Sequence, residues 1–367
     1  MKRFLGISFA AFIALIAFAL ISVDTSAVAG FRHGCHGRRC HGRSHGLRNR
    51  RQNRCHGEQA NACESNECSS CTSGCSDYTS GCSDSTSGCA DGNCGGGAVI
   101  TEEAAAVEPL KVLIVAGGCC HDYATQTKLL KNGIEERINA SVEIIYNPDT
   151  STEARFEIYE SDGWARDFDV VIHDECSANV SERPYVDRIL NAHRNGVPAV
   201  NLHCAMHSYR WGNFQEPVAD GADNSGWYEM IGIQSSRHGP QSPINVTYSD
   251  HIIANGLSSW ETLNEELYNN VRVYDSSNVV ASGRQMQMPK KKKNKPVNPD
   301  AKPTEANAVV AWTNEFGPKK TRIFSTSLGH NNDTVGDDRY LNLICRGLLW
   351  STHKLTDSGK PVSGYGK

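Results

Sequence analysis

The feature that most restricts the fold of this chain is a short apolar run that ends in glycine and then in polar residues. Residues 112–115 have the length and β-branching of a buried strand, and Gly117 and Gly118 end the run. His121 and Asp122 follow. A buried strand that runs through a glycine turn into a helix is typical of an open parallel α/β sheet, whose ligands bind at the carboxyl ends of the strands. We therefore expect functional side chains at this turn.

The segments after this turn alternate between helical and strand patterns. Apolar stripes predict one helix over residues 123–139 and a second between Ser181 and Gly196. Short apolar runs predict further buried strands at residues 142–146, 168–172 and 197–202. This alternation predicts an α/β fold of the doubly wound kind, with a mainly parallel sheet and helices on both faces.

The second half of the chain is less regular. Helices are expected over residues 227–233 and 338–350, and strands over residues 244–248, 267–274, 279–281, 309–313 and 322–327. A lysine-rich run at residues 290–295 lies among prolines and is typical of a solvated loop. The net charge of −4 leaves no basic surplus, so we expect no nucleic-acid partner.

The N-terminal segment has the pattern of an export signal. Lys2 and Arg3 precede an apolar run over residues 4–21, and Ala27-Val28-Ala29 offers a small-x-small cleavage site. This pattern predicts a signal peptide over residues 1–29 and an exported protein, which is periplasmic, at the cell surface or secreted. An uncleaved N-terminal membrane anchor is the alternative, because the apolar run is nearly long enough to span a bilayer.

Residues 30–107 are of low complexity and rich in Cys, His, Gly and Ser. Ten of the fifteen cysteines lie here, with very few large apolar side chains, so the segment cannot bury a core and is predicted to be a spacer. Its cysteines suggest disulfide-linked or cell-surface partners, with soft-metal binding as the alternative. The globular domain is predicted over residues 108–353. Residues 354–367 contain Gly, Ser and Pro and are expected to form a flexible tail.

Seven short motifs follow one another in the globular part. They are Gly117-Gly118 with His121-Asp122, Leu202-His203-x-Ala205, Trp227 with Gly232 and Arg237-His238, His251-Ile252-Ile253-x-x-Gly256-Leu257, Glu266-Leu267-Tyr268, Trp312 with Gly317, and Arg322-Ile323-Phe324 with Leu328-Gly329-His330. In this order they resemble the ThuA-like, or trehalose-utilisation, family over about residues 110–352. The resemblance implies a flavodoxin-like sheet related to class I glutamine amidotransferases, and a sugar-like small molecule as the ligand.

The comparison with amidotransferases argues against a cysteine nucleophile. Those enzymes hold the nucleophile on a sharp strand-to-helix turn and serve it with a His-x-Glu pair. Here His203 stands at the turn and Cys204 comes one residue late. The later pair is His330 with Asn332, so the orienting carboxylate is missing. We therefore exclude glutamine hydrolysis and expect Cys204 to be a small buried residue.

The candidate site consists of side chains that the fold would bring to one edge of the sheet and into one pocket. His121, His203 and His330 each follow a predicted strand, and the family resemblance adds Glu266 and His238. The predicted catalytic residues are His121, His203, His330 and Glu266. The predicted substrate-binding residues are Asp122, Arg237, His238 and Tyr268.

Three functions are open for these side chains. In the first, His and Glu transfer protons on a sugar or sugar derivative, since His titrates near neutrality. In the second, two or three histidines and Glu266 hold a divalent metal in a hydrolase or lyase. His207 is a further candidate ligand, because it lies four residues after His203 at a helix start. In the third, a non-catalytic module binds glycans at the cell surface.

Two other clusters have structural interpretations. His173, Asp174 and Glu175 follow the predicted strand at residues 168–172, and we expect them to form a polar strand end. Cys119-Cys120 is expected to pack in the first turn, with a reactive thiol there as the alternative.

Overall fold

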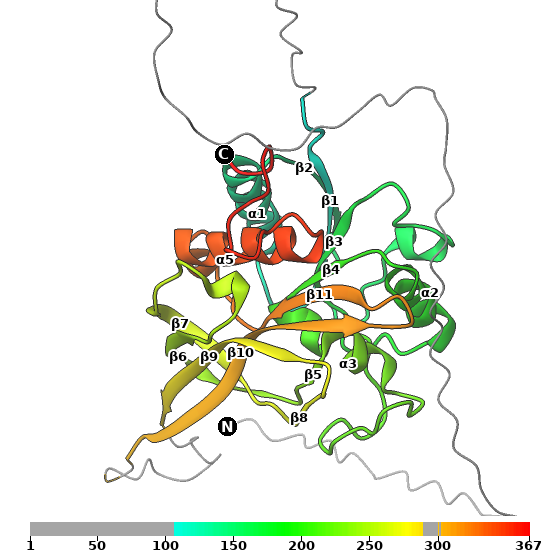
Figure 1. Cartoon of the computed structure of the whole chain (residues 1–367). Helices are drawn as coiled ribbons and strands as arrows, with labels where there is room; N and C mark the ends of the chain where they lie inside the picture. The colour runs from blue at the N-terminus through cyan, green and yellow to red at the C-terminus, as the bar shows by residue number, and fades with distance from the viewer. Residues whose placement is uncertain (1–105, 289–299, 301) are drawn as a thin grey trace, which may run out of the picture. The chain divides into compact units, whose positions relative to one another are not determined.

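The computed structural model describes residues 106–288, 300 and 302–367 (Figure 1). The predicted signal peptide, the predicted spacer up to residue 105 and the lysine-rich run lie outside the described residues. No helix in the described part of the chain combines the length and the apolar character that crossing a membrane requires.

Among the described residues, nine strands form one mixed sheet in the order β2-β1-β3-β4-β11-β10-β9-β6-β7 (Figure 1). The first five strands in this order run parallel to one another. They are β2 (Ala140–Asn147), β1 (Leu110–Gly118), β3 (Val170–Cys176), β4 (Ala199–Leu202) and β11 (Thr321–Thr326). The predicted α/β sheet with parallel strands in its core is confirmed.

The other four strands of the sheet pair in antiparallel fashion. They are β10 (Thr304–Phe316), β9 (Asn278–Gln287), β6 (His238–Tyr248) and β7 (Trp260–Tyr268). A separate short pair consists of β5 (Ile233–Gln234) and β8 (Arg272–Val273). The predicted strand at residues 244–248 covers only the apolar end of β6, because the first half of β6 is mostly exposed and polar.

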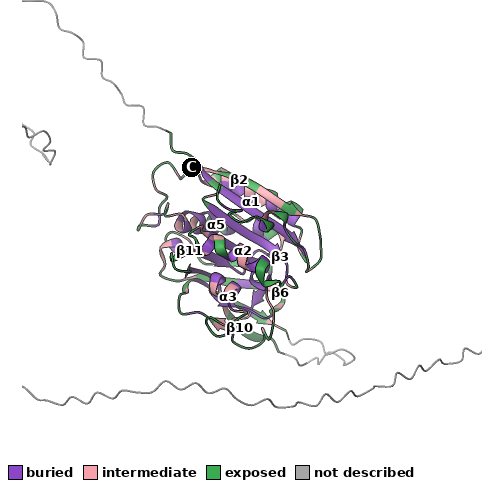
Figure 2. Cartoon of the chain, turned by 90° about the vertical axis from the view of Figure 1, so that its right-hand side faces the viewer, coloured by how far each residue is buried: buried purple, intermediate pink, exposed green. Residues whose placement is uncertain are grey.

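Helices cover both faces of the parallel half (Figure 1). Strands β1, β3, β4 and β11 are almost entirely buried, whereas the edge strand β2 is mostly half-buried or exposed (Figure 2). One face carries α1 (Tyr123–Arg137) and α5 (Asp338–Ser351), and the other carries α2 (Arg183–Arg194) and α3 (Gly226–Ile231). The shorter helices are η1 (Glu157–Glu160), η2 (His203–His207), η3 (Ile252–Ala254) and α4 (Asn332–Val335).

Strand β1 is apolar throughout its centre because both of its faces are covered. Val112 and Ile114 belong to the core that includes residues of α1 and α5, whereas Leu113 and Val115 belong to the core that includes residues of α2 and α3. Each such side chain stabilises the fold by about 1.5–3 kcal/mol when it is fully buried. The run therefore holds β1 between β2 and β3 in the parallel half, and its carboxyl end carries the glycine turn.

His173, Asp174 and Glu175 form the polar end of β3, as predicted, but they belong to the strand and do not follow it. They lie inside β3, which continues beside β1 as far as Cys176, and all three are buried. His173 Nδ1 lies 2.9 Å from Glu175 Oε1, and His173 Nε2 lies 2.9 Å from His193 Nε2. His173 therefore pairs with Glu175 within β3 and with His193 of α2, which ties the strand to the helix.

The prediction of a flexible tail at residues 354–367 is wrong. Leu355 pairs with Pro361, Ile138 pairs with Gly366, and Tyr365 packs against the core under α1 and α5. The apolar residues scattered among Gly and Ser in this segment hold it on the domain.

Candidate functional site

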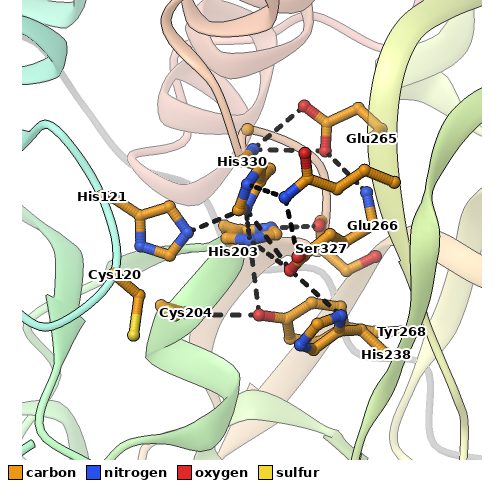
Figure 3. A network of polar contacts seen from close by, with 12 residues as sticks. Cys120, His121, His203, Cys204, His238, Glu265, Glu266, Tyr268, Ser327 and His330 are labelled. Carbon is orange, nitrogen blue, oxygen red and sulfur yellow. Dashed lines mark hydrogen bonds and ion pairs between the residues drawn. The ribbon is translucent and has the colours of Figure 1, made fainter.

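Three histidines come together at the carboxyl ends of the parallel strands. His121 follows β1, His203 begins η2 directly after β4, and His330 lies in the loop after β11. Parallel strands end at the same edge of the sheet, so residues far apart in the sequence meet there. Figure 3 shows the three side chains gathered at one place. We refer to His121, His203 and His330 as the histidine cluster.

The ring nitrogens of the histidine cluster lie within contact distance. His121 Nε2 is 3.0 Å from His330 Nδ1, and His330 Nδ1 is 3.4 Å from His203 Nε2. The ring centroids of His121 and His203 are 4.9 Å apart. One nitrogen from each ring lies within 4.8 Å of the other two. A single small ligand or ion is therefore able to contact all three rings.

Glu266, in β7, joins the histidine cluster. Its Oε2 atom lies 3.4 Å from His330 Nδ1 and 3.6 Å from His203 Nε2. The same atom lies 3.3 Å from His238 Nδ1, and the side chain of His238 is 43 % exposed whereas that of Glu266 is 9 % exposed. The backbone N–H of His330 donates to Glu265 at 3.0 Å, which ties the loop after β11 to β7.

Hydrogen bonds outside the histidine cluster determine where two of its rings carry their protons. His203 Nδ1 donates to the Ser327 carbonyl at 2.7 Å. His121 Nδ1 lies 3.1 Å from the Tyr123 hydroxyl, which donates its own proton to the Cys119 carbonyl. Because a carbonyl only accepts, both Nδ1 atoms carry protons, and the Nε2 atoms of His121 and His203 present lone pairs to the cluster.

His330 carries the proton inside the histidine cluster. The side-chain nitrogen of Gln241 lies 2.7 Å from His330 Nε2 and 3.4 Å from Glu266 Oε1, and it donates to both. The His330 proton is therefore on Nδ1, which faces His121 Nε2 and His203 Nε2. The Tyr268 hydroxyl, 3.3 Å from His203 Nε2, is a second donor at this edge of the cluster.

The turn after β4 carries a histidine in a strained conformation. His203 has φ of +37°, in the left-handed region that is costly for residues other than glycine. The Cys204 thiol is buried and lies 3.7 Å from the Tyr268 hydroxyl. The expectation that Cys204 is a buried residue is confirmed. Its lack of a nucleophilic role stays a prediction.

The family model for ThuA, described as trehalose utilisation, matches residues 111–351 of this chain. The chain belongs to the ThuA family. No curated protein is similar enough to the chain to count as a match.

Solved structures with a similar arrangement include two ThuA-like proteins. The one from Parabacteroides merdae is 16 % identical, with a TM-score of 0.46 over 67 % of this chain and 90 % of that chain. The one from Bacteroides uniformis is 15 % identical, with a TM-score of 0.45 over 67 % and 93 %. A GH42 β-galactosidase from G. stearothermophilus is 15 % identical, with a TM-score of 0.39 over 66 % of this chain and 30 % of that chain. These values are too low to carry an argument about function.

Burial and mutual contacts shift the pKa values in this ThuA domain. Burial, followed by the proximity of His203 and His330, lowers the pKa of His121 to about 2. The hydrogen bond to Glu266 raises the pKa of His330. Burial opposes the ionisation of Glu266, but its contacts with His203 and His330 outweigh burial and hold the pKa of its carboxyl well below the usual range. A neutral His121 therefore lies beside a His330–Glu266 pair that favours opposite charges.

The exposed members of the predicted site set in the ThuA domain line more than one pocket. An open pocket of about 570 Å³ is lined by Cys120, His121, Asp122, His330, Asn331, Asn332 and Asp333. A second pocket of about 350 Å³ includes Arg237, His238 and Tyr268 in its lining. The side chains of His203 and Glu266 are buried and line neither of these two pockets, so one pocket shared by all the predicted site residues stays a prediction.

Three predicted residues have roles that the structure makes plain. Asp122 caps α1, since its carboxylate accepts from the Thr125 backbone at 3.3 Å and from Asn332 at 2.9 Å. The backbone N–H of Arg237 donates to the Asn269 side chain at 2.9 Å. His207 lies outside the histidine cluster, because η2 is a 3-10 helix, in which residues four apart do not face the same way.

Sequence reasoning missed the partners that orient the histidine cluster. These are Tyr123, Gln241, Glu265 and the carbonyl of Ser327. Tyr123 could have been found from the sequence, because it lies two residues after His121. No sequence pattern marks Gln241 or Ser327, because their contacts depend on how the antiparallel half and the loop after β11 meet the ends of the parallel strands.

The expectation that Cys119 and Cys120 are merely packed in the first turn is wrong, because a disulfide joins them. Cys176, at the end of β3, lies beside them with its Sγ atom 3.5 Å from that of Cys119. Of these three cysteines only Cys176 has a free thiol.

Proposed function

We propose that His121, His203 and His330 hold a divalent metal ion, and that this centre acts on a sugar or sugar derivative by hydrolase or lyase chemistry. The spacing of the ring nitrogens, 3.0 and 3.4 Å, carries the proposal. A tetrahedral ion with metal–nitrogen bonds of about 2.0–2.1 Å separates its ligand atoms by about 3.3–3.4 Å. The imidazoles therefore have the spacing of a set of metal ligands before any metal binds.

The count of protons supports the same proposal. The single proton on His330 Nδ1 serves only one of three acceptors at a time: His121 Nε2, His203 Nε2 and Glu266 Oε2. A cation at this position would be attracted by all of them. If the Gln241 amide turned over, its oxygen would face His330 Nε2 and accept a hydrogen bond from it. The His330 proton would then lie on Nε2, and Nδ1 would be free for the metal. A metal-binding histidine usually donates its other ring N–H to an oxygen in this way.

Three histidines with an open fourth position form a common ligand set of catalytic zinc sites. A bound divalent ion supplies polarisation of a substrate oxygen and lowers the pKa of bound water. Glu266 is a carboxylate beside the ligand nitrogens, at 3.4 Å from His330 Nδ1. His238, at 3.3 Å from Glu266 and 43 % exposed, would pass the proton of Glu266 to solvent.

A sugar-like substrate is supported by two observations. The family description is trehalose utilisation. The open pocket beside His121 and His330 has carboxylate and amide side chains on its rim, contributed by Asp122, Asn331, Asn332 and Asp333. Such groups suit the hydroxyls of a sugar, because they accept and donate hydrogen bonds in several directions.

Acid–base catalysis without a metal is the second candidate function. The observation that favours it is the His330–Glu266 pair, in which contact with Glu266 raises the pKa of the imidazole. In this alternative His330 gives a proton to the substrate while Glu266 or neutral His121 accepts one. The two candidates differ in whether the purified protein needs a metal.

The deciding experiment measures metal content and affinity in the purified full chain. The protein is stripped with a chelator, incubated with Zn²⁺ or Mn²⁺, dialysed and analysed for metal. We expect one equivalent per chain in the wild type, none above background in His203→Ala, and a full equivalent in the control His251→Ala, whose ring contacts Thr313 instead. Circular dichroism checks that His203→Ala is folded, since loss of the bond to Ser327 costs about 1–2 kcal/mol.

The variant Glu266→Gln separates the two roles of the site. It should keep the metal, because the three histidines suffice as ligands, and lose turnover in a screen of glycosides and keto-sugars. A wild type that binds no metal under these conditions refutes the metal centre and leaves the acid–base alternative.

Export of the domain on a cysteine-rich spacer is a separate proposal. It is supported by the basic start, the apolar run and the small-x-small site of residues 1–29. N-terminal sequencing of the mature protein checks it. A mature chain that still begins at Met1 would contradict cleavage and favour the membrane-anchor alternative.

A further inference from the structure

Three cysteines lie together beside the histidine cluster. Cys119 and Cys120 form a disulfide at the turn after β1, and Cys176 ends the neighbouring strand β3. The Cys176 Sγ atom is 3.5 Å from Cys119 Sγ, a contact distance for two sulfurs. The Cys119 backbone N–H also donates to the Cys176 carbonyl at 3.3 Å, which holds the two residues together. A free thiol is thus held against one sulfur of a disulfide.

The surroundings of Cys176 favour its role as the attacking thiol. A hydrogen bond from Cys204 lowers the pKa of Cys176, and the positive charge of Arg210 lowers it further against the effect of burial. Disulfide exchange begins with a thiolate that reaches a disulfide sulfur, and the contact between Cys176 and Cys119 meets this need.

We propose that Cys176 exchanges with the Cys119–Cys120 disulfide and releases Cys120 as a free thiol in the pocket beside His121. The Cys176 thiolate attacks Cys119 Sγ, a Cys119–Cys176 bond forms, the Cys119–Cys120 bond breaks, and Cys120 leaves as a thiolate. Cys120 then takes up from solvent a proton equivalent to the one that Cys176 lost. One disulfide is present before and after, so the step needs no external oxidant or reductant.

The exchange changes what the open pocket offers to a ligand. Cys120 is exposed and lines that pocket together with His121, whereas Cys176 is buried. Cys120 also has φ of +86°, a left-handed conformation that is costly for a residue with a side chain, and opening its disulfide removes one constraint on it. The exchanged form therefore presents to the pocket a nucleophilic thiol that takes soft electrophiles.

The test is alkylation of the native full chain, purified without reductant. Iodoacetamide is added under native conditions, and the digested protein is mapped without reduction by mass spectrometry. The described cysteines that are free before exchange, Cys176, Cys204 and Cys345, are all buried. We expect the label on Cys120 before it appears on these three, accompanied by a peptide pair that carries the Cys119–Cys176 link.

Two variants make the result specific. Labelling of Cys120 should fall at least about tenfold in Cys176→Ala, which lacks the attacking thiol, and should stay within about twofold in the matched control Cys345→Ala. An intact, unlabelled Cys119–Cys120 pair in the wild type overturns the proposal. Equal labelling of Cys120 in Cys176→Ala, or a link from Cys119 to any other cysteine, also overturns it. If Cys176→Ala does not fold, the wild-type map decides alone. The labelling result does not depend on metal content, so the proposal of disulfide exchange and the proposal of a metal centre are refuted by different results.

Discussion

The close contact between the first turn and β3 leads to a quantitative prediction for Gly118→Ala. Gly118 has φ of +93°, and a Cβ atom added there would lie 2.3 Å from the carbonyl oxygen and 2.8 Å from the carbonyl carbon of Cys176. Both atoms belong to the backbone of β3, so no side-chain rotation relieves the overlap. Gly256 is a matched control, because its φ of +81° is similar and nothing lies within 4 Å of its added Cβ.

Two costs add at Gly118, and the control isolates one of them. The left-handed conformation costs alanine about 1–2 kcal/mol relative to glycine, and this cost applies to both positions. Overlap with a packed neighbour typically costs a further 1–3 kcal/mol, and this cost applies only to Gly118. We therefore expect Gly256→Ala to lower the free energy of unfolding by about 1–2 kcal/mol and Gly118→Ala to lower it by about 2–5 kcal/mol.

Urea unfolding of the full chain, followed by far-ultraviolet circular dichroism, measures both values. An unchanged m-value shows that the variants differ in stability and not in the extent of unfolding. The displaced turn should also weaken metal binding in Gly118→Ala, since His121 follows it. A Gly118→Ala variant whose unfolding free energy is within about 0.5 kcal/mol of that of Gly256→Ala would refute the reasoning.

Four further predictions can be checked with the same preparations. Tyr123→Phe removes the acceptor of His121 Nδ1 and should weaken metal binding about 10–100-fold in a competitive chelator titration. The control Tyr340→Phe should leave the metal affinity unchanged, and equal affinities of the two variants would contradict the prediction. Cys204→Ala should bind metal and ligand like the wild type, and a glutamine analogue that labels Cys204 selectively would contradict it. Removal of residues 354–367 should lower the melting temperature by several degrees, because Tyr365 packs on the core; an unchanged value would show that the segment adds no stability. Deletion of residues 31–98 should leave the melting temperature unchanged, and a loss of several degrees would show that they pack on the domain.

The parallel half of the fold could be predicted because its strands are covered on both sides. Residues 112–115 are apolar at every position, and they form the centre of β1. The histidine cluster could be predicted for the same reason, since the strands that precede His121, His203 and His330 are parallel and end at one edge.

The partners of the histidine cluster could not be predicted from local patterns. Gln241 lies in the exposed, polar half of β6, and Ser327 contributes only a carbonyl, so neither position has a distinctive residue pattern. Glu266 was expected from the family resemblance and not from its spacing. The polar groups inside β3 were misplaced because His173 and Glu175 satisfy each other within the core, which a sequence pattern does not reveal.

The sequence by itself determined which side chains reach the site edge, because hydrophobic periodicity decides where strands begin and end and parallel strands end together. Only the tertiary structure decided how those side chains face one another. The 3.0 Å contact of His121 with His330, the proton positions in the cluster and the contact of Cys176 with Cys119 depend on the relative placement of segments distant in sequence. That placement results from the packing of the whole domain, so no short stretch of the sequence predicts it.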